Sequence, residues 1–488
     1  MSTRRVTTAL AAAALLAGCG STVPQSTRQA SLDNGLDAPG TSTNTQSLTQ
    51  PQSLSPGQLG GRQIAGSTGQ PQSAATSAPN TTTDVPVDVP TSAPTKDPLR
   101  VGLLYTAGAE QAGKTLGIDG LATGDPVAQA KAIAAYLNAR GGVLGRQIKL
   151  FPYGVSTSDN ANNPAAAQEA ACTSFTQDSH VSVVISYNNL LPSFLQCLRK
   201  GGAYAIDDAQ GPAEKSMSRL PDSLFQPGGL LPGRLYRNVV EAFGASGFLT
   251  TTSKVGLFSY DDNDSTDTIN SFVKPALAKL GITSITVEQT TNDAAGISAN
   301  SAIVAKFAAS GVDKIIAVGA SPLFLMQAAE SQGYHPKYGL NSGFGPGALF
   351  ETAAPPNQLK GSQSFGFQPY SDIGRGNRGG AVNPNETLCL KIMKNAGQGS
   401  TAATTQLLQV QLCDTLFFLH DAATKGGGVS GPQMAAGAAQ LGTSWPSPAT
   451  FSAGFPNHRP DGVSSYRLAV FVDSCSCYQY QGGRRPTS

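Results

Sequence analysis

Residues 99–150 constrain the fold of this chain more than any other stretch. Residues 99–105 are an apolar run of strand length, and residues 146–151 form a second such run. Between them, apolar residues recur at three- and four-residue steps over 127–137, which is the periodicity of a helix. A strand, a helix and a strand in this order predict a βαβ unit. Its two strands are then parallel, and its crossover is right-handed.

Sequence signals mark both the start and the end of the predicted helix. Asp125 precedes Pro126, which is the favoured order of an N-cap and a first helical residue. Gly141 and Gly142 close the helix, because glycine adopts the left-handed C-cap conformation freely. The same alternation of strands and helices continues along the chain and predicts an α/β fold. The further expected strands are 181–186, 203–206, 254–259, 282–288, 314–318, 338–341 and 466–472, and the helices are 164–179, 191–200, 233–248, 266–280, 298–310, 323–332, 386–396 and 402–425.

A helix that ends in Asn138-Ala-Arg-Gly-Gly-Val-Leu-Gly-Arg146 and leads directly into a strand resembles the first unit of type I periplasmic binding proteins. The closest subgroup is that of the branched-chain amino-acid (Leu/Ile/Val) receptors of ABC transporters. The resemblance implies two doubly wound parallel-sheet lobes with a hinge and a central cleft. It places the first lobe at 97–226 plus 361–452, and the second at 227–360 plus 453–484.

The first residues have the pattern of an export signal. Arg4 and Arg5 precede an apolar run over 9–16, which is too short to cross a bilayer as a mature helix. The run leads to Leu16-Ala-Gly-Cys19, which resembles the lipobox of bacterial lipoproteins. We therefore expect a signal peptide over 1–19 and acylation of Cys19. An ordinary signal peptide with an incidental cysteine is the alternative.

Composition limits the remaining possibilities. Residues 20–96 are rich in Ser, Thr, Gln, Pro and Gly and predict a disordered tether, because such a segment buries too little apolar surface to fold. The rest, roughly 390 residues, suits two lobes better than one core. A net charge of +2 with 13% charged residues gives no electrostatic footprint for nucleic acid. The four histidines lack metal-ligand spacing, so neither a metal nor a cofactor is expected.

Six cysteines remain after Cys19, and an exported protein with six cysteines suggests disulfides. Six cysteines allow fifteen pairings, and the sequence alone does not choose among them. Spacing favours neighbouring pairs, and the branched-chain receptors commonly carry a disulfide at the place of the first. The last pair requires a bend, because residues two apart in a straight strand lie near the upper limit for bridging. The favoured pairs are Cys172–Cys197, Cys389–Cys413 and Cys475–Cys477.

Ligands of open α/β sheets bind at the carboxyl ends of the strands, and two facing lobes would bring these ends around one cleft. The loops that follow the predicted strands carry hydroxyl, amide, carboxylate and small residues, which suit a polar ligand. The expected ligand-binding residues are Tyr105, Ser186, Tyr187, Asn188, Asp207, Asp208, Ala209, Tyr260, Asp261, Ala320, Ser321 and Ser342.

The resemblance also implies how a ligand would be held. The amino-acid receptors usually hold the α-carboxylate with small and Ser/Thr residues after the third and fourth strands. Here Asp207 and Asp208 stand at the latter place, and two carboxylates repel an anion unless they are protonated or paired. A cation, a polyol, a sugar or an amide-bearing ligand is therefore as compatible as an amino acid. Asp261 would face an ammonium group if the ligand has one.

One rival motif lies after the first strand. The residues from Gly108 to Thr115 match G-x-x-x-x-G-K-[ST], the phosphate-binding loop of nucleotide hydrolases. That loop requires a helix that starts at its Lys-Thr pair. Three glycines and a proline within the eleven residues after Thr115 disfavour such a helix. We interpret the stretch as a loop that lines the cleft.

The sequence thus predicts an extracytoplasmic solute-binding lipoprotein. It would be a monomer on the bacterial cell membrane that captures a small polar molecule and delivers it to an ABC permease. No catalytic residue is expected. One alternative keeps the fold in a ligand sensor or accessory lipoprotein that signals to a membrane partner. The other is a P-loop NTPase.

Overall fold

The computed structural model describes residues 96–116, 118, 121–374 and 383–488. The predicted signal peptide, Cys19 and nearly all of the tether lie outside the described residues. No helix within the described ranges combines the length and the apolarity that a membrane crossing requires.

A five-stranded sheet is built from the first part of the described chain. Its strands run in the order β2-β1-β3-β4-β5, and every neighbouring pair is parallel. This is the doubly wound order, in which the chain reverses direction across the sheet between β1 and β3. The strands are β1 Lys96–Ala107, β2 Arg146–Ser156, β3 Val183–Ser186, β4 Tyr204–Asp207 and β5 Leu224–Phe225.

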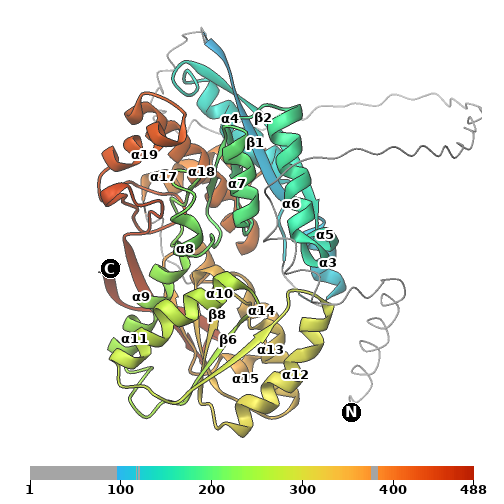
Figure 1. Ribbon diagram of the computed structural model, residues 1–488, viewed down its shortest axis with the longest axis vertical. Coiled ribbons are helices and arrows are strands. Elements are labelled where there is room, and N and C mark those ends of the chain that lie inside the picture. The colour runs from blue at the N-terminus through green and yellow to red at the C-terminus, as the bar shows by residue number, and fades with distance from the viewer. Residues whose placement is uncertain (1–95, 117, 119–120, 375–382) are drawn as a thin grey trace, which may run out of the picture. The chain divides into compact units, whose positions relative to one another are not determined.

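Helices cover both faces of this sheet (Figure 1). Side chains of β3 alternate between the faces, so that Val183 and Ile185 join one core and Val184 joins the other. The first core includes α4 Pro126–Asn138, α17 Pro384–Asn395, α18 Ala403–Gly426 and α19 Gly431–Gln440. The second core includes α6 Pro164–Thr173, the π-helix η1 Ser174–Asp178 and α7 Pro192–Lys200. Short helices α5 Thr157–Asn162 and α8 Glu214–Met217 complete this part.

The ends of α4 are as the sequence predicts. The Asp125 carboxylate accepts hydrogen bonds from the N–H groups of Val127 and Ala128 at 2.9 and 3.0 Å. Gly142 has φ +67°, and a Cβ atom on it would lie 2.0 Å from the carbonyl oxygen of Arg146. The helix therefore turns into β2 over a position that only glycine can occupy.

A seven-stranded sheet is built from the second part. Its order is β12-β11-β10-β9-β8-β6-β7. The strands from β6 to β10 are parallel, whereas β11 and β12 pair antiparallel at one edge. The strands are β6 Val255–Tyr260, β7 Ile285–Thr290, β8 Lys314–Val318, β9 Lys337–Asn341, β10 Gln363–Gly366, β11 Ser465–Val472 and β12 Cys477–Pro486.

This second sheet also has a core on each face. Val255 and Leu257 of β6 pack with α9 Pro232–Ala245, the π-helix η2 Ile269–Val273 and α11 Lys274–Lys279. Phe258 packs with α12 Ala294–Ala309 and α13 Leu323–Ser331. The remaining helical segments are α10 Asn263–Thr268, η3 Ser342–Phe344, η4 Pro346–Phe350, α14 Glu351–Ala353, α15 Pro356–Leu359, α16 Pro369–Asp372 and η5 Pro456–His458.

Several elements differ from the sequence prediction. The stretch that we interpreted as a loop forms the helix α3 Ala109–Thr115. The predicted strand 282–288 lies three residues later in β7, and the helix predicted at 298 starts at Ala294, where the Asp293 carboxylate caps the N–H of Gly296 at 2.9 Å. The sequence reading missed α19, β10 and β12, because their residues lack a clear apolar period.

Three disulfides join the pairs that spacing favours. The Cα atoms of Cys172 and Cys197 lie 6.3 Å apart, those of Cys389 and Cys413 5.9 Å, and those of Cys475 and Cys477 5.2 Å. The bend that the last pair requires is the turn between β11 and β12, where Ser476 has φ +49°.

Loop length predicts how much each disulfide stabilises the protein. Replacing Cys172 and Cys197 together by alanine is expected to lower the free energy of unfolding by about 3 kcal/mol, because their loop of 25 residues gains much entropy in the unfolded chain. The same change at Cys475 and Cys477, two positions apart, should cost about half as much. Urea denaturation of both variants measures this difference, and equal losses would contradict the loop-entropy account.

Candidate functional site

A cavity of about 320 Å³ lies where strands of both sheets end. The loops after β3 and β4 contribute Tyr187, Asp208 and Ala209, which the sequence predicts as site residues. The predicted Tyr260 is the last residue of β6, and the loops after β8 and β9 contribute the predicted Ser321 and Ser342. Further lining residues are Asn189, Gln210, Gly229, Leu230, Leu235, Gly319, Asn341, Gly343, Phe344, Gly345, Phe367, Gln368, Leu407 and Gln411.

The other six predicted residues do not line the cavity. Ser186 and Asp207, the last residues of β3 and β4, are fully buried, and so is Ala320. Asn188 accepts a hydrogen bond from the Thr106 hydroxyl at 2.7 Å and thereby fastens its loop to β1. Asp261 is exposed, and Tyr105 is half-buried within β1.

Sequence reasoning missed two groups of lining residues. Phe367 and Gln368 follow β10, a four-residue strand with only one large apolar residue. Leu407 and Gln411 are four positions apart on α18 and therefore share a helix face. The helix itself is predicted, but Gln411 is one of several polar residues on it, such as Gln409, and nothing in the sequence distinguishes it as the one that faces a cavity.

The ends of β3 and β4 form a closed polar cluster. The N–H of Asn188 donates to the Ser186 hydroxyl at 2.9 Å, and the N–H of Ala209 donates to the Asp207 carboxyl at 3.2 Å. Burial raises the pKa of Asp207 well above its usual range, and the neighbouring Asp208 raises it further. These strand-end donors are therefore occupied by groups of the protein itself.

A second buried acid pair lies behind the cavity wall. Asp208, 3% exposed, lies beside the carboxyl of Asp414 on α18, which is 0% exposed. Its other contact is the N–H of Gly228, at 2.8 Å from Oδ1. Burial raises the pKa of Asp208 to about 7 and that of Asp414 well above its usual range. Two carboxyl groups buried this close together disfavour a second negative charge, so the pair tends to keep a proton.

On the side of the seven-stranded sheet, Ser342 connects the cavity to a third buried acid. The Ser342 hydroxyl donates to Asp372 at 2.6 Å and accepts the N–H groups of Phe367 and Gln368 at 2.7 and 3.0 Å. The Tyr480 hydroxyl donates to the same carboxyl at 2.8 Å. Burial raises the pKa of Asp372 to about 8, although these hydrogen bonds oppose the shift.

The helix lies on the wrong side of the phosphate-loop motif for binding a phosphate. In that motif the helix starts at the Lys-Thr pair, so that its N-terminus faces a phosphate. Here Lys114 and Thr115 end α3, and Gly108 precedes its first residue. The interpretation as a cleft-lining loop is wrong as well, because these residues are helical and none of them lines the cavity.

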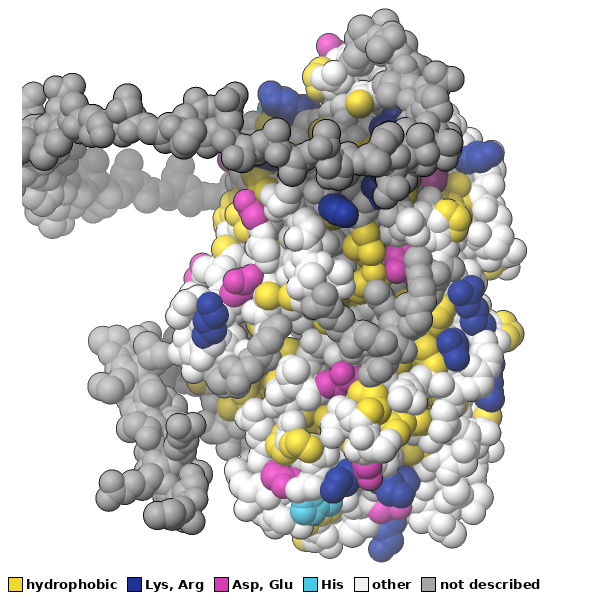
Figure 2. Space-filling view, turned by 180° about the vertical axis from the view of Figure 1, so that it is seen from behind, with side chains coloured by type: hydrophobic (Ala, Val, Ile, Leu, Met, Phe, Trp, Pro, Cys, Tyr) yellow, Lys and Arg dark blue, Asp and Glu magenta, His cyan; other side chains and the backbone are white. Residues whose placement is uncertain are grey.

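Charge does not concentrate on the face of the described residues in Figure 2, where basic and acidic side chains lie scattered among uncharged ones.

Two doubly wound sheets with strand ends around one cavity define the class of the bilobal solute-binding proteins. A family model, described as "Periplasmic binding protein", matches residues 99–470. The chain belongs to this family.

Solved structures share the fold at low sequence identity. The leucine-binding protein LivK from Thermotoga maritima MSB8 is 13% identical with a TM-score of 0.55, and the match covers 79% of this chain and 98% of that one. LivJ from Streptococcus pneumoniae, in complex with isoleucine, is 12% identical with a TM-score of 0.55 and coverages of 79% and 99%. An ABC-transporter solute-binding protein from Rhodopseudomonas palustris BisB5, in complex with 3,4-dihydroxybenzoic acid, is 15% identical, with a TM-score of 0.57 and coverages of 80% and 98%. No curated protein matched the sequence.

Proposed function

We propose that this protein is an extracytoplasmic solute-binding lipoprotein that captures a small polar molecule and delivers it to an ABC permease. The observation that carries the proposal is the cavity itself, since loops after strands of both sheets line it. Its volume of about 320 Å³ lies at the lower end of the range of about 300–1,000 Å³ for ligand sites, which suits a small solute.

The two sheets are proposed as the centres of two lobes that close around the solute. Segments near the expected lobe boundaries pair with each other. The N–H of Gln226 donates to the carbonyl of Pro460 at 2.8 Å, and the N–H of Gly462 donates to the carbonyl of Gln226 at 2.8 Å. The expected ranges start the second segment of the first lobe at residue 361. Because β10 belongs to the seven-stranded sheet, we propose that this segment starts after Gly366 instead.

The mode of attachment and the partner are part of the proposal. Acylation of Cys19 would hold the protein, as a monomer, at the outer face of the cell membrane, and residues 20–96 would be its tether. Membership of the periplasmic binding proteins supports an extracytoplasmic location and a membrane permease as partner. A ligand sensor of the same fold is the alternative role. The polarity of α3 argues against nucleotide hydrolysis.

The amino acids and the aromatic acid named for the solved structures are starting candidates for the solute. Amino acids, aromatic acids, sugars and polyols should therefore be tested together. A solute at a hundred times its dissociation constant adds about 2.7 kcal/mol of stability, enough to raise the melting temperature by a few degrees. We expect one class of solute to produce this shift in the full oxidised chain.

A pair of variants tests whether the shift arises in the cavity. Ser321 lines the cavity, and Ser331 ends the neighbouring helix α13; both are exposed. Ser321→Trp should abolish the shift because the indole fills part of the cavity, whereas Ser331→Trp should leave it intact. A shift that survives Ser321→Trp would place the binding site elsewhere.

A further inference from the structure

We propose that the cavity selects an uncharged, hydroxyl-rich solute, a sugar or polyol, over any solute that carries a carboxylate. The inference rests on the proposed solute-binding function and names its substrate class. Three observations on the described residues carry it: the kinds of side chain that line the cavity, the occupation of its backbone donors, and a buried amide without a partner.

The lining offers nothing to neutralise an anion. Among the described residues that border the cavity, none is Lys, Arg or His. The one carboxyl, that of Asp208, is turned to Gly228 and Asp414 behind the wall. A carboxylate that leaves water for such a site loses its hydration and gains no opposite charge in return, which disfavours its binding.

Four backbone N–H groups of the lining that could replace a cation already donate to groups of the protein. The N–H of Gly319 donates to the Tyr236 hydroxyl at 2.7 Å, and that of Gly343 donates to Asn341 at 2.8 Å. The N–H of Gly229 donates to the carbonyl of Gln226 at 3.2 Å, and that of Ala209 to Asp207 at 3.2 Å. These four lining residues cannot bind a carboxylate without breaking an existing hydrogen bond.

The most buried polar side chain of the lining without a partner in the described part of the protein is an amide. The side chain of Gln411 on α18 lines the cavity, is 8% exposed, and has no hydrogen-bond partner among the described residues. A primary amide donates two hydrogen bonds and accepts two, which matches a hydroxyl group that both donates and accepts. Because the amide borders the cavity and no group in the described part of the chain occupies it, a hydroxyl-bearing solute can exchange hydrogen bonds with it.

Aromatic rings on the cavity wall also match the shape and chemistry of a sugar. Tyr187, Tyr260, Phe344 and Phe367 border the same cavity, and they come from strand ends and loops of both sheets. A sugar ring presents hydroxyls around its edge and C–H groups on its faces. Its edge would therefore meet the amide of Gln411, and its faces would lie against the aromatic walls.

The test titrates the full oxidised chain with glucose, ribose, myo-inositol, glycerol and mannitol, and separately with leucine, isoleucine, glutamate and 3,4-dihydroxybenzoate, by calorimetry at one pH. We expect saturable binding of at least one member of the first group and none of the second. Gln411→Ala should weaken that binding at least tenfold, whereas Gln440→Ala, at the exposed end of α19, should leave it within twofold.

The outcomes separate the two proposals. Binding of a carboxylate-bearing solute alone would overturn the selectivity and leave the solute-binding function standing. Binding of a sugar or polyol that Gln411→Ala does not weaken would overturn the assignment of the amide, provided that the variant melts like the parent protein. A chain that binds no member of either group would overturn both the selectivity and the proposed function.

Discussion

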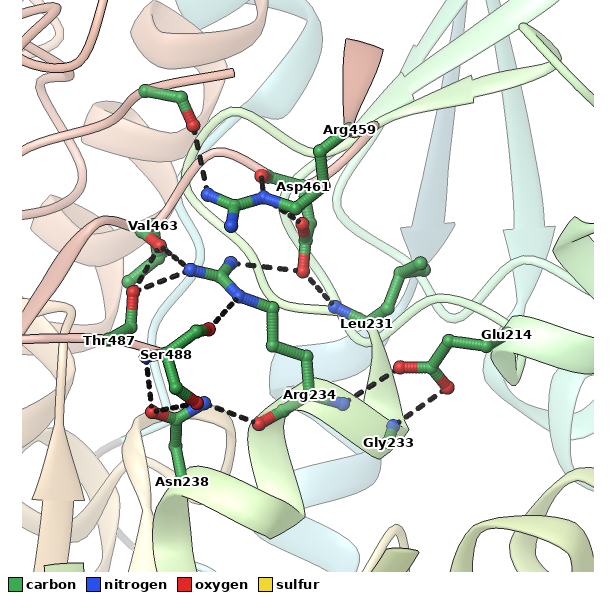
Figure 3. A network of polar contacts seen from close by, with 11 residues as sticks. Glu214, Leu231, Gly233, Arg234, Asn238, Arg459, Asp461, Val463, Thr487 and Ser488 are labelled. Atoms are coloured by element: carbon green, nitrogen blue, oxygen red, sulfur yellow. Dashed lines mark hydrogen bonds and ion pairs between the residues drawn. The ribbon is translucent and has the colours of Figure 1, made fainter. Parts of the chain in front are cut away.

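Replacing Asp461 with alanine is expected to lower the free energy of unfolding by about 3–5 kcal/mol. Asp461 is fully buried between two arginines (Figure 3). Its Oδ2 atom lies 3.2 Å from Nη1 of Arg234, and its Oδ1 atom lies 2.8 Å from Nε of Arg459. Oδ2 also accepts the N–H of Leu231 at 2.9 Å. Alanine would leave a buried guanidinium without its counter-charge and a buried N–H without an acceptor.

The surroundings of Arg234 make relaxation difficult. Its guanidinium also donates to the main-chain oxygens of Val463 and Ser488, both at 2.8 Å, and the backbone N–H of Arg234 donates to Glu214 at 2.7 Å. The same carboxylate caps the N-terminus of α9 through the N–H of Gly233 at 2.8 Å. Arg234 therefore cannot move toward water without breaking several hydrogen bonds (Figure 3).

Urea denaturation measures the loss, with two comparisons. Asp461→Asn keeps a hydrogen-bond acceptor but loses the charge, so its loss should be smaller. Asp267→Ala removes an ion pair of 2.9 Å whose Lys215 side chain is 65% exposed, and it should cost less than about 1 kcal/mol. Equal losses for Asp461→Ala and Asp267→Ala would show that burial of the network contributes nothing.

The second large effect is a loss of stability as pH rises. Burial raises the pKa of Asp372 to about 8, whereas the unfolded carboxyl titrates near 3.9. Between these values the unfolded state releases its proton and the folded state keeps it. Asp372 therefore stabilises the fold fully below about pH 4, and its contribution falls by up to about 1.4 kcal/mol per pH unit until about pH 8.

Asp372→Asn isolates this effect, because an amide has nearly the same shape and does not titrate. We expect the free energy of unfolding of the parent protein to fall between pH 5 and pH 8, and to fall less steeply in the variant. The exposed Asp473 supplies the control, and Asp473→Asn should leave the slope unchanged. The parent slope persisting in Asp372→Asn would assign the pH dependence to other acids, such as Asp208 and Asp414.

The parts of the fold that depend on local chemistry could be predicted from the sequence. Asp125 caps the start of α4 and Gly142 forms the turn after it, so residues next to the helix determine where it begins and ends. The parallel strands follow from their order, and six of the twelve predicted site residues line the cavity because they end or follow those strands.

The parts that depend on distant contacts could not be predicted. Gln411 matters because α18, more than 180 residues after β4, brings it to the cavity. Asp207 is a strand-end carboxylate in the sequence, but the structure buries it against its own loop instead of exposing it to a ligand. Neither helical period nor strand order contains this information.

The crowding at Gly142 limits how this position can change as the sequence diverges. A side chain there would collide with the carbonyl of Arg146 at 2.0 Å and would have to adopt φ +67°. Most surface positions accept substitution within ±0.5 kcal/mol, so drift can erase them. This one admits no replacement while the helix turns into the strand in this way, so we expect it to resist the drift by which overall identity to solved relatives has fallen to 12–15%.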